Sequence, residues 1–237
     1  MSFNLTKIPS GGEFGEAKEG GRQPPFCFAS LPAMHDDPAI LILAAGAARR
    51  MRGADKLLQV IDGEAQLTRI ARAACRTGWR VLVALPPDRP DRAAAIAGLG
   101  AEAIPVPDAA SGMAASIRAG VAAAGTARLL MVLPADMPEL GHADLAKVAT
   151  VALAAPNRIT RATAADGTPG HPVVFPAKIL PALSRLTGDE GARAILADRR
   201  DTINAVALPG TRATLDLDTP EDWAAWSATR GSPAPGR

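Results

Sequence analysis

The fold is decided by one stretch of the chain, AILILAAGAARRMRGADKLL, which runs from Ala39 to Leu58. Its opening run is wholly apolar, which is typical of a strand buried on both faces of a parallel sheet. Ala44, Ala45 and Gly46 then carry small side chains or none, so their backbone N–H groups can approach a ligand closely. Exposed N–H groups in such a turn form a concavity that binds anions.

Positive charge is concentrated directly after this turn. Arg50 brings a forked guanidinium and Lys56 a compact ammonium, and the pair suits a polyphosphate. The alternative is a basic surface loop whose small residues merely turn the chain, because short glycine motifs give many false matches. Two familiar phosphate loops are excluded, since Gly46 lacks the further glycines of the dinucleotide fingerprint and Lys56 follows Asp55 where a P-loop has glycine. The missing fingerprint also argues against an oxidoreductase.

The composition of the 237-residue chain, 48% hydrophobic and 21% charged, is that of one soluble globular domain. Only 3% of the residues are aromatic and the net charge is +2, which argues against a nucleic-acid partner. Cys27 and Cys75 support neither a disulfide framework nor a metal site. No apolar run approaches the ~20 residues of a membrane span, and no signal-peptide core is visible. We therefore expect a cytoplasmic protein without membrane contact.

Both ends of the chain differ from its body. Residues 1–38 are rich in Gly, Glu and Lys without periodicity, and residues 229–237 are similar, so we expect two disordered extensions around a domain at 39–228. In the first half of that domain, apolar runs alternate with amphipathic stretches. Strands are predicted at 40–44, 81–85, 103–106 and 129–133, and helices at 65–77, 92–99 and 113–123, with Ser111 as a candidate N-cap.

This alternation predicts a doubly wound, Rossmann-like α/β fold, with a mostly parallel sheet and helices on both faces. Ligands bind such folds at the carboxyl ends of the strands. The second half is less regular, and we expect it to extend the sheet and form the acceptor side of a cleft. Its predicted elements are strands at 159–164, 173–175, 202–208 and 214–217, two helices from Ala177 and Ala192, and a final helix from Pro220.

Aspartates follow two of these strands. Asp136 comes after the buried strand of LLMVLPADMPEL, and a carboxylate there, facing a phosphate loop, is placed to hold Mg²⁺. The alternative is that it caps the next helix or turn. For a second oxygen ligand we choose Asp218, with Asp216 as its competitor, because residues two apart in a strand share one face. Equally, Asp218 or Thr219 could simply cap the final helix.

Six segments, in order from Leu43 to Trp223, resemble the signature motifs of the nucleotidyltransferases related to the molybdenum-cofactor enzymes, the MobA-like NTP transferase family. They are LAAGAARRMRGADKLL, GMAASIRAG, LPADMPEL, GHPVVFP, GDEGAR and LDLDTPEDW. Within this family, the chain resembles the molybdenum cofactor cytidylyltransferases, which transfer CMP from CTP to molybdopterin. Two positions depart from the signature: Ala48 stands where serine is usual and Arg52 where glycine is usual.

The resemblance implies a division of the site residues. Asp136 would hold the metal. Ala45, in an Ala-Ala-Gly turn, would indicate CTP rather than GTP as the nucleotide substrate. Residues of the nucleotide site would be Leu43, Ala44, Ala45, Gly46, Arg50 and Lys56, with Gly112, Met113 and Ser116 near the base and ribose. Residues facing the pterin would be Gly170, His171, Pro172, Asp189 and Arg193.

Several of these residues also have ordinary structural interpretations. Gly170 gives close backbone access, whereas a single histidine beside proline, such as His171, is more often structural than catalytic. Asp189 and Arg193 are four apart and would pair along a helix face. No arrangement of His, Ser and acid indicates a hydrolytic triad.

The expected chemistry is therefore Mg²⁺-dependent nucleotidyl transfer, with catalysis by positioning and by the charges of Lys56, Arg50 and the metal. The partners would be CTP or GTP, molybdopterin and a recipient molybdoenzyme. The alternatives are a guanylyltransferase to molybdopterin, a sugar-phosphate nucleotidyltransferase, or a non-enzymatic carrier that delivers molybdopterin to an apoenzyme.

Overall fold

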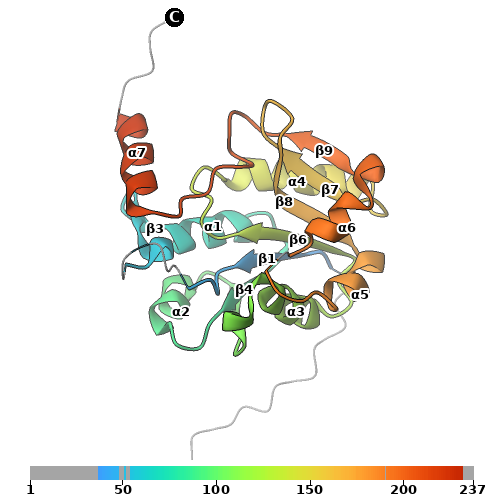
Figure 1. Ribbon diagram of the computed structural model, residues 1–237, viewed down its shortest axis with the longest axis horizontal. Helices are drawn as coiled ribbons and strands as arrows, with labels where there is room; N and C mark the ends of the chain where they lie inside the picture. Colours follow the sequence, from blue (N-terminus) through green and yellow to red (C-terminus); the bar gives the residue numbers. More distant parts are fainter. Residues whose placement is uncertain (1–36, 48–50, 52–53, 190, 232–237) are drawn as a thin grey trace, which may run out of the picture. The chain divides into compact units, whose positions relative to one another are not determined.

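The computed structural model describes residues 37–47, 51, 54–189 and 191–231. Most of the two extensions expected at 1–38 and 229–237 lies outside the described residues. Arg50, in the loop after the first strand, also lies outside them. The domain is built on a seven-stranded sheet in the order β5-β4-β1-β6-β8-β7-β9 (Figure 1). The strands are β1 (Ala39–Leu43), β4 (Arg80–Leu85), β5 (Ala101–Pro105), β6 (Leu129–Pro134), β7 (Thr160–Thr163), β8 (Pro169–Pro176) and β9 (Asn204–Ala207).

The sheet has a parallel half and a mixed half. Strands β5, β4, β1 and β6 run parallel, which confirms the mostly parallel sheet predicted from the apolar runs. Strand β8 then pairs antiparallel with both β6 and β7, while β7 and β9 are parallel to one another. The carboxyl ends of the four parallel strands therefore meet at one edge of the sheet.

Helices cover both faces of the sheet, as predicted. In β1, Ile40 and Ile42 face helices α1 (Gln66–Cys75) and α4 (His142–Ala154), whereas Leu41 packs on the opposite face with α3 (Met113–Ala124). A side chain at Gly120 of α3 would collide with Leu41, so this helix lies close against the strand. The remaining helices of this body are α2 (Pro90–Ile96), α5 (Leu180–Leu183), α6 (Arg193–Ala197) and the 3-10 turns η2 (Lys56–Leu58), η3 (Ala109–Ser111), η4 (Ala177–Ile179) and η5 (Arg200–Thr202).

A smaller hydrophobic cluster lies beside the main sheet. The two-stranded hairpin of β2 (Val60–Ile61) and β3 (Glu64–Ala65) and the final helix α7 (Pro220–Gly231) contribute to it. Its two indole rings meet edge to face, with centroids 6.0 Å apart. The buried members are Met51, Ile61, Leu217, Trp223 and Trp226.

Some local predictions are wrong. Residues 214–217 form a turn and an irregular segment instead of a strand, and neither helix α4 nor the β2–β3 hairpin was predicted. Ser111 does not cap α3, because Gly112 occupies the N-cap position and the Ser111 hydroxyl donates to the Asp108 carbonyl. Within the described residues, no helix is both long and apolar enough to cross a membrane.

Candidate active site

A pocket of about 710 Å³ opens at the carboxyl ends of β1, β4, β5 and β6. Below we call it the nucleotide pocket. Most of the residues expected to contact the nucleotide lie on its wall: Leu43, Ala45, Gly46, Lys56, Gly112, Met113 and Ser116, together with Asp136, Asp189 and Asp218. Ala44 is buried beneath the wall and is not part of it.

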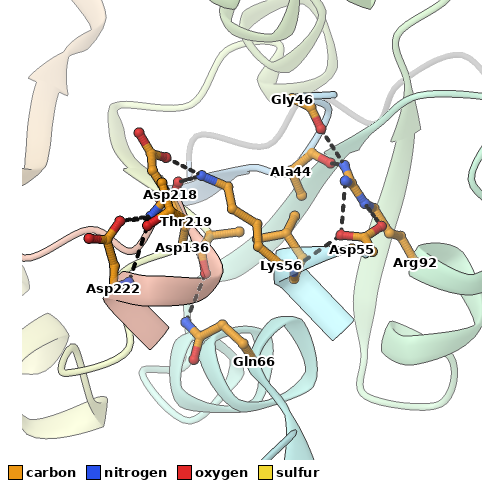
Figure 2. Close-up of polar contacts among 12 residues, drawn as sticks. Ala44, Gly46, Asp55, Lys56, Gln66, Arg92, Asp136, Asp218, Thr219 and Asp222 are labelled. Atoms are coloured by element: carbon orange, nitrogen blue, oxygen red, sulfur yellow. Dashed lines mark hydrogen bonds and ion pairs between the residues drawn. The ribbon is translucent and has the colours of Figure 1, made fainter. Parts of the chain in front are cut away.

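Lys56 joins the two aspartates chosen as metal ligands. Its Nζ lies 2.5 Å from Oδ2 of Asp136 and 2.6 Å from Oδ1 of Asp218 (Figure 2). The side chains of Lys56 and Asp136 are only 14% and 16% exposed, so this ion pair is screened less by water than a surface pair. Residues separated by 80 and 162 positions in the chain therefore form one charged centre.

The backbone explains how the two carboxylates come together. The Ala135 N–H donates to the Leu43 carbonyl, which fixes the loop after β6 against the end of β1. The buried side chain of Gln66 donates to the Ala135 carbonyl at 2.8 Å, and the Leu217 N–H donates to the Asp136 carbonyl at 3.3 Å. This last bond brings the irregular segment before α7 alongside the loop that carries Asp136.

The end of that segment settles which residue caps α7. The Thr219 hydroxyl accepts from the Asp222 N–H, and the Asp222 carboxylate accepts from the N–H groups of Thr219 and Asp218. This reciprocal pair is a capping box. Because Thr219 makes the cap, the Asp218 carboxylate is directed to Lys56 instead, as Figure 2 shows.

The charges of this centre shift the pKa values of two groups. Burial alone would lower the pKa of the Lys56 ammonium, but the carboxylates of Asp136 and Asp218 outweigh it and raise the pKa, so the lysine stays charged. Partial desolvation, reinforced by the two neighbouring carboxylates, raises the pKa of Asp216. Asp216 does not line the nucleotide pocket, and Asp218 does.

The two carboxylates fit a divalent metal ion of the Mg²⁺ class. Oδ1 of Asp136 is buried and has no hydrogen-bond partner among the described residues, so it is available to a cation. Within the described parts of the chain, no group of three or more His, Cys, Asp or Glu side chains is arranged to hold a metal ion. Mg²⁺ commonly binds through one or two carboxylates together with water and substrate phosphates, so two suffice.

A fully buried arginine, Arg92, packs beneath the turn that follows β1 and bonds to its carbonyl groups. The guanidinium of Arg92 pairs with Asp55 and donates to the carbonyls of Ala44 and Gly46 (Figure 2). No motif in the sequence indicates this group, since Arg92 was predicted only as the first residue of a helix.

A second pocket, of about 600 Å³, adjoins the first and shares Leu43, Met113 and Asp189 with it. We call it the acceptor pocket. Its floor is apolar, and three arginines lie on its wall: Arg161, Arg193 and Arg200. Among the described residues, none of these arginines has a carboxylate within ion-pair distance.

Of the five residues expected to face the pterin, His171, Asp189 and Arg193 line the acceptor pocket, whereas Gly170 and Pro172 do not. Burial, and then the charge of Arg161, lowers the pKa of His171, so its imidazole is neutral near pH 7. A side chain at Gly170 would collide with the Ala213 carbonyl. The glycine therefore allows the backbone near Ala213, rather than a ligand, to approach closely.

Asp189 connects the two pockets. It lies in a turn before α6, so the helical pairing with Arg193 is wrong. Its Oδ1 accepts from the Met113 N–H at 3.2 Å, at the start of α3. Gly112 has φ 109°, and a side chain there would run into Asp189 and the Gly188 carbonyl, so glycine is required.

Comparisons with known proteins identify the family and the fold. No curated protein matches the chain. Among solved structures, Rv0371c from Mycobacterium tuberculosis H37Rv is 27% identical, with 80% of this chain and 97% of that chain covered and a TM-score of 0.70. A complex of Rv0371c with manganese matches at 26% identity over the same shares, with a TM-score of 0.66.

A more distant structure, CMP:2-keto-3-deoxy-manno-octonic acid synthetase in complex with CTP, shares the fold. It is 15% identical, with 82% of this chain and 98% of that chain covered and a TM-score of 0.64. The family model of the MobA-like NTP transferase domain matches residues 40–203. The chain therefore belongs to the family of the MobA-like NTP transferase domain, whose members are nucleotidyltransferases.

Proposed function

We propose that the protein transfers CMP from CTP to molybdopterin, giving molybdopterin cytosine dinucleotide and pyrophosphate. The observation that carries this proposal is the centre formed by Lys56, Asp136 and Asp218 on the wall of the nucleotide pocket. An ammonium beside a carboxylate pair suits a triphosphate with its divalent ion. Support for the metal comes from the manganese complex of Rv0371c.

In this proposal the triphosphate lies along the turn after β1, where Ala45 and Gly46 line the pocket. Lys56 neutralises the charge that develops as pyrophosphate departs. A divalent ion held by Asp136 and Asp218 would supply further positive charge to the phosphate oxygens. Arg50, which lies outside the described residues, stays a predicted partner of the same phosphates.

The acceptor phosphate attacks the α-phosphorus in line, one P–O bond forms, and the bond to pyrophosphate breaks. The attacking oxygen is already anionic, so no strong general base is required. This agrees with the neutral, half-buried His171, which the transfer does not need as a base. The chain's main tasks are orientation and charge neutralisation.

The acceptor pocket supports an anionic acceptor. Arg161 lies on its wall, and burial lowers the pKa of this guanidinium. A partly desolvated arginine without a carboxylate partner is best satisfied by an anionic ligand. Together with Arg193 and Arg200, it gives the pocket the charge that a phosphorylated pterin needs.

Cytosine specificity is proposed on narrower support. A protein of this fold has been solved with CTP, and Ala45 lines the nucleotide pocket. A single methyl group in a pocket discriminates by ~1–3 kcal/mol at most. The same site with GTP, or with a sugar phosphate as acceptor, is the runner-up.

The direct test is incubation of the protein with molybdopterin, Mg²⁺ and either CTP or GTP, followed by mass detection of the dinucleotide. We expect the cytosine dinucleotide and one pyrophosphate for each product molecule. A guanine dinucleotide alone would replace the proposal with its runner-up. Absence of both products, with delivery of unchanged molybdopterin to an apoenzyme, would identify a carrier instead.

A further inference from the structure

Arg92 of α2 is the only fully buried arginine in the described part of the chain, with an exposed fraction of 0%. It makes four hydrogen bonds. Its Nε and one terminal nitrogen hold the two carboxylate oxygens of Asp55 at 2.7 and 3.0 Å, which is a bidentate pair. The other terminal nitrogen donates to the carbonyls of Ala44 at 2.5 Å and Gly46 at 2.9 Å.

These two carbonyl contacts fix the direction of two peptide planes. In a trans peptide the N–H group points opposite to the carbonyl oxygen. The N–H groups of Ala45 and Ala47 share planes with the carbonyls of Ala44 and Gly46, so they point away from Arg92. Ala45 and Ala47 both line the nucleotide pocket. Arg92 therefore holds this turn in an orientation that suits an anion.

The other half of the guanidinium acts on the lysine. Asp55 is the N-cap of η2, and its Oδ1 accepts from the Leu57 N–H at 3.0 Å. Lys56 is the first residue of this turn. Because one carboxylate both caps the turn and pairs with Arg92, the base of the Lys56 side chain is tied to the same guanidinium (Figure 2).

We propose that Arg92, together with Asp55, is the positioning residue of the triphosphate site. It fixes the position of Lys56 relative to the turn after β1 while touching no substrate itself. Arg92 is absent from the wall of both pockets, which agrees with an indirect role. The inference rests on the proposed function only in requiring a nucleoside triphosphate in the nucleotide pocket, and it is independent of the acceptor.

A second arginine provides a matched control. Arg80 also makes a bidentate pair, with Glu102 at 2.7 and 2.8 Å, and also donates to a carbonyl, that of Ala123 at 3.0 Å. Neither Arg80 nor Glu102 lines a pocket. If buried or half-buried arginine pairs matter only for folding, Arg80 and Arg92 should behave alike toward nucleotide.

The test is isothermal titration of the full chain with CTP and with GTP, each with Mg²⁺, for wild type, R92M, R92K and R80M, beside their melting temperatures. We expect all three variants to melt lower than wild type. R92M should bind the preferred nucleotide at least about tenfold more weakly, the size of one or two lost charged hydrogen bonds. R92K should also bind more weakly, because an ammonium cannot replace the planar fork.

R80M should bind as tightly as wild type. If R92M does not fold, R92K decides the question at a temperature where it is fully folded. Equal affinity of a folded Arg92 variant and the wild type would overturn the inference and leave the proposed function standing. Failure of the wild type to bind either nucleotide would overturn both.

Discussion

The two pockets are neighbours, yet they are built in different ways. The nucleotide pocket lies at the carboxyl ends of the parallel strands, and its charged groups lie on loops and turns, among them Asp136 after β6, Lys56 in η2 and Asp218 in the segment before α7. The acceptor pocket takes Arg161 from within β7 and His171 from within β8, in the mixed half of the sheet, and Arg193 from the start of α6.

This difference separates two kinds of chemistry. Loops at strand ends can supply backbone N–H groups and carboxylates, which suit the phosphates and metal that every nucleoside triphosphate shares. Side chains on strand faces can be exchanged without disturbing the loops, so they suit recognition of a particular acceptor. The parallel half should therefore govern turnover and nucleotide binding, and the mixed half should govern acceptor binding.

The strongest test of this division is Asp136→Ala. We expect metal-dependent transfer to fall by at least about 10³-fold, because the site loses the proposed metal ligand and the charge that holds Lys56. The rate of pyrophosphate release measures this, and the melting temperature should show that the fold is kept. Asp216→Asn is the control, with nearly full activity expected. Similar rates for the two variants would contradict the choice of carboxylate.

Lys56→Ala is expected to lower kcat by about 100-fold while changing CTP affinity much less, because its charge matters most as pyrophosphate departs. A second readout needs no acceptor. Without nucleotide, the variant should bind Mn²⁺ more tightly than wild type, since the ammonium no longer neutralises the carboxylates of Asp136 and Asp218. Unchanged turnover, or weaker Mn²⁺ binding, would argue against this role.

In the acceptor pocket, Arg161→Met should raise the KM for molybdopterin by about tenfold, the size of one lost charge-assisted contact, and leave the KM for CTP unchanged. Arg158→Met is the matched control, because Arg158 is exposed, donates to the Thr202 carbonyl and lines neither pocket. An equal rise in the KM for CTP would break the division between the pockets.

The smallest effect on catalysis is expected from Gly46→Ala. A side chain at Gly46 would meet no protein atom within 4 Å, so stability should be unchanged, while CTP binding weakens by about two- to fivefold as the methyl group enters the pocket. Gly170→Ala should do the reverse and lower the melting temperature, because the Ala213 carbonyl occupies its place. Loss of stability in Gly46→Ala would contradict this assignment.

Prediction from the sequence succeeded in placing the groups that directly follow strands of the parallel half. Asp136 and the turn at Ala44–Gly46 were found because each comes directly after an apolar run, and parallel strands bring such ends to one edge of the sheet. The alternating runs likewise predicted the four parallel strands and the helices between them, but not the order of the strands in the sheet. Helix α4 was missed because its alanine-rich sequence places apolar residues on every face, so its periodicity is weak.

Prediction failed where a residue acts through a distant partner. Arg92 and Asp55 are 37 positions apart, and nothing in either neighbourhood indicates the pair. The choice between Asp216 and Asp218 could not be made from a strand pattern, because the segment that carries them is not a strand. Its position depends on the bond from Leu217 to Asp136 and on the packing of α7, which are tertiary contacts.

That late segment has a consequence for biosynthesis of the protein. On a ribosome, β1, β4, β5 and β6 are synthesised long before Asp218, and Asp218 reaches Lys56 only when the Leu217 bond and the indole cluster of α7 form around it. The ion-paired centre of Lys56, Asp136 and Asp218 is therefore complete only in polypeptides whose translation has passed this helix.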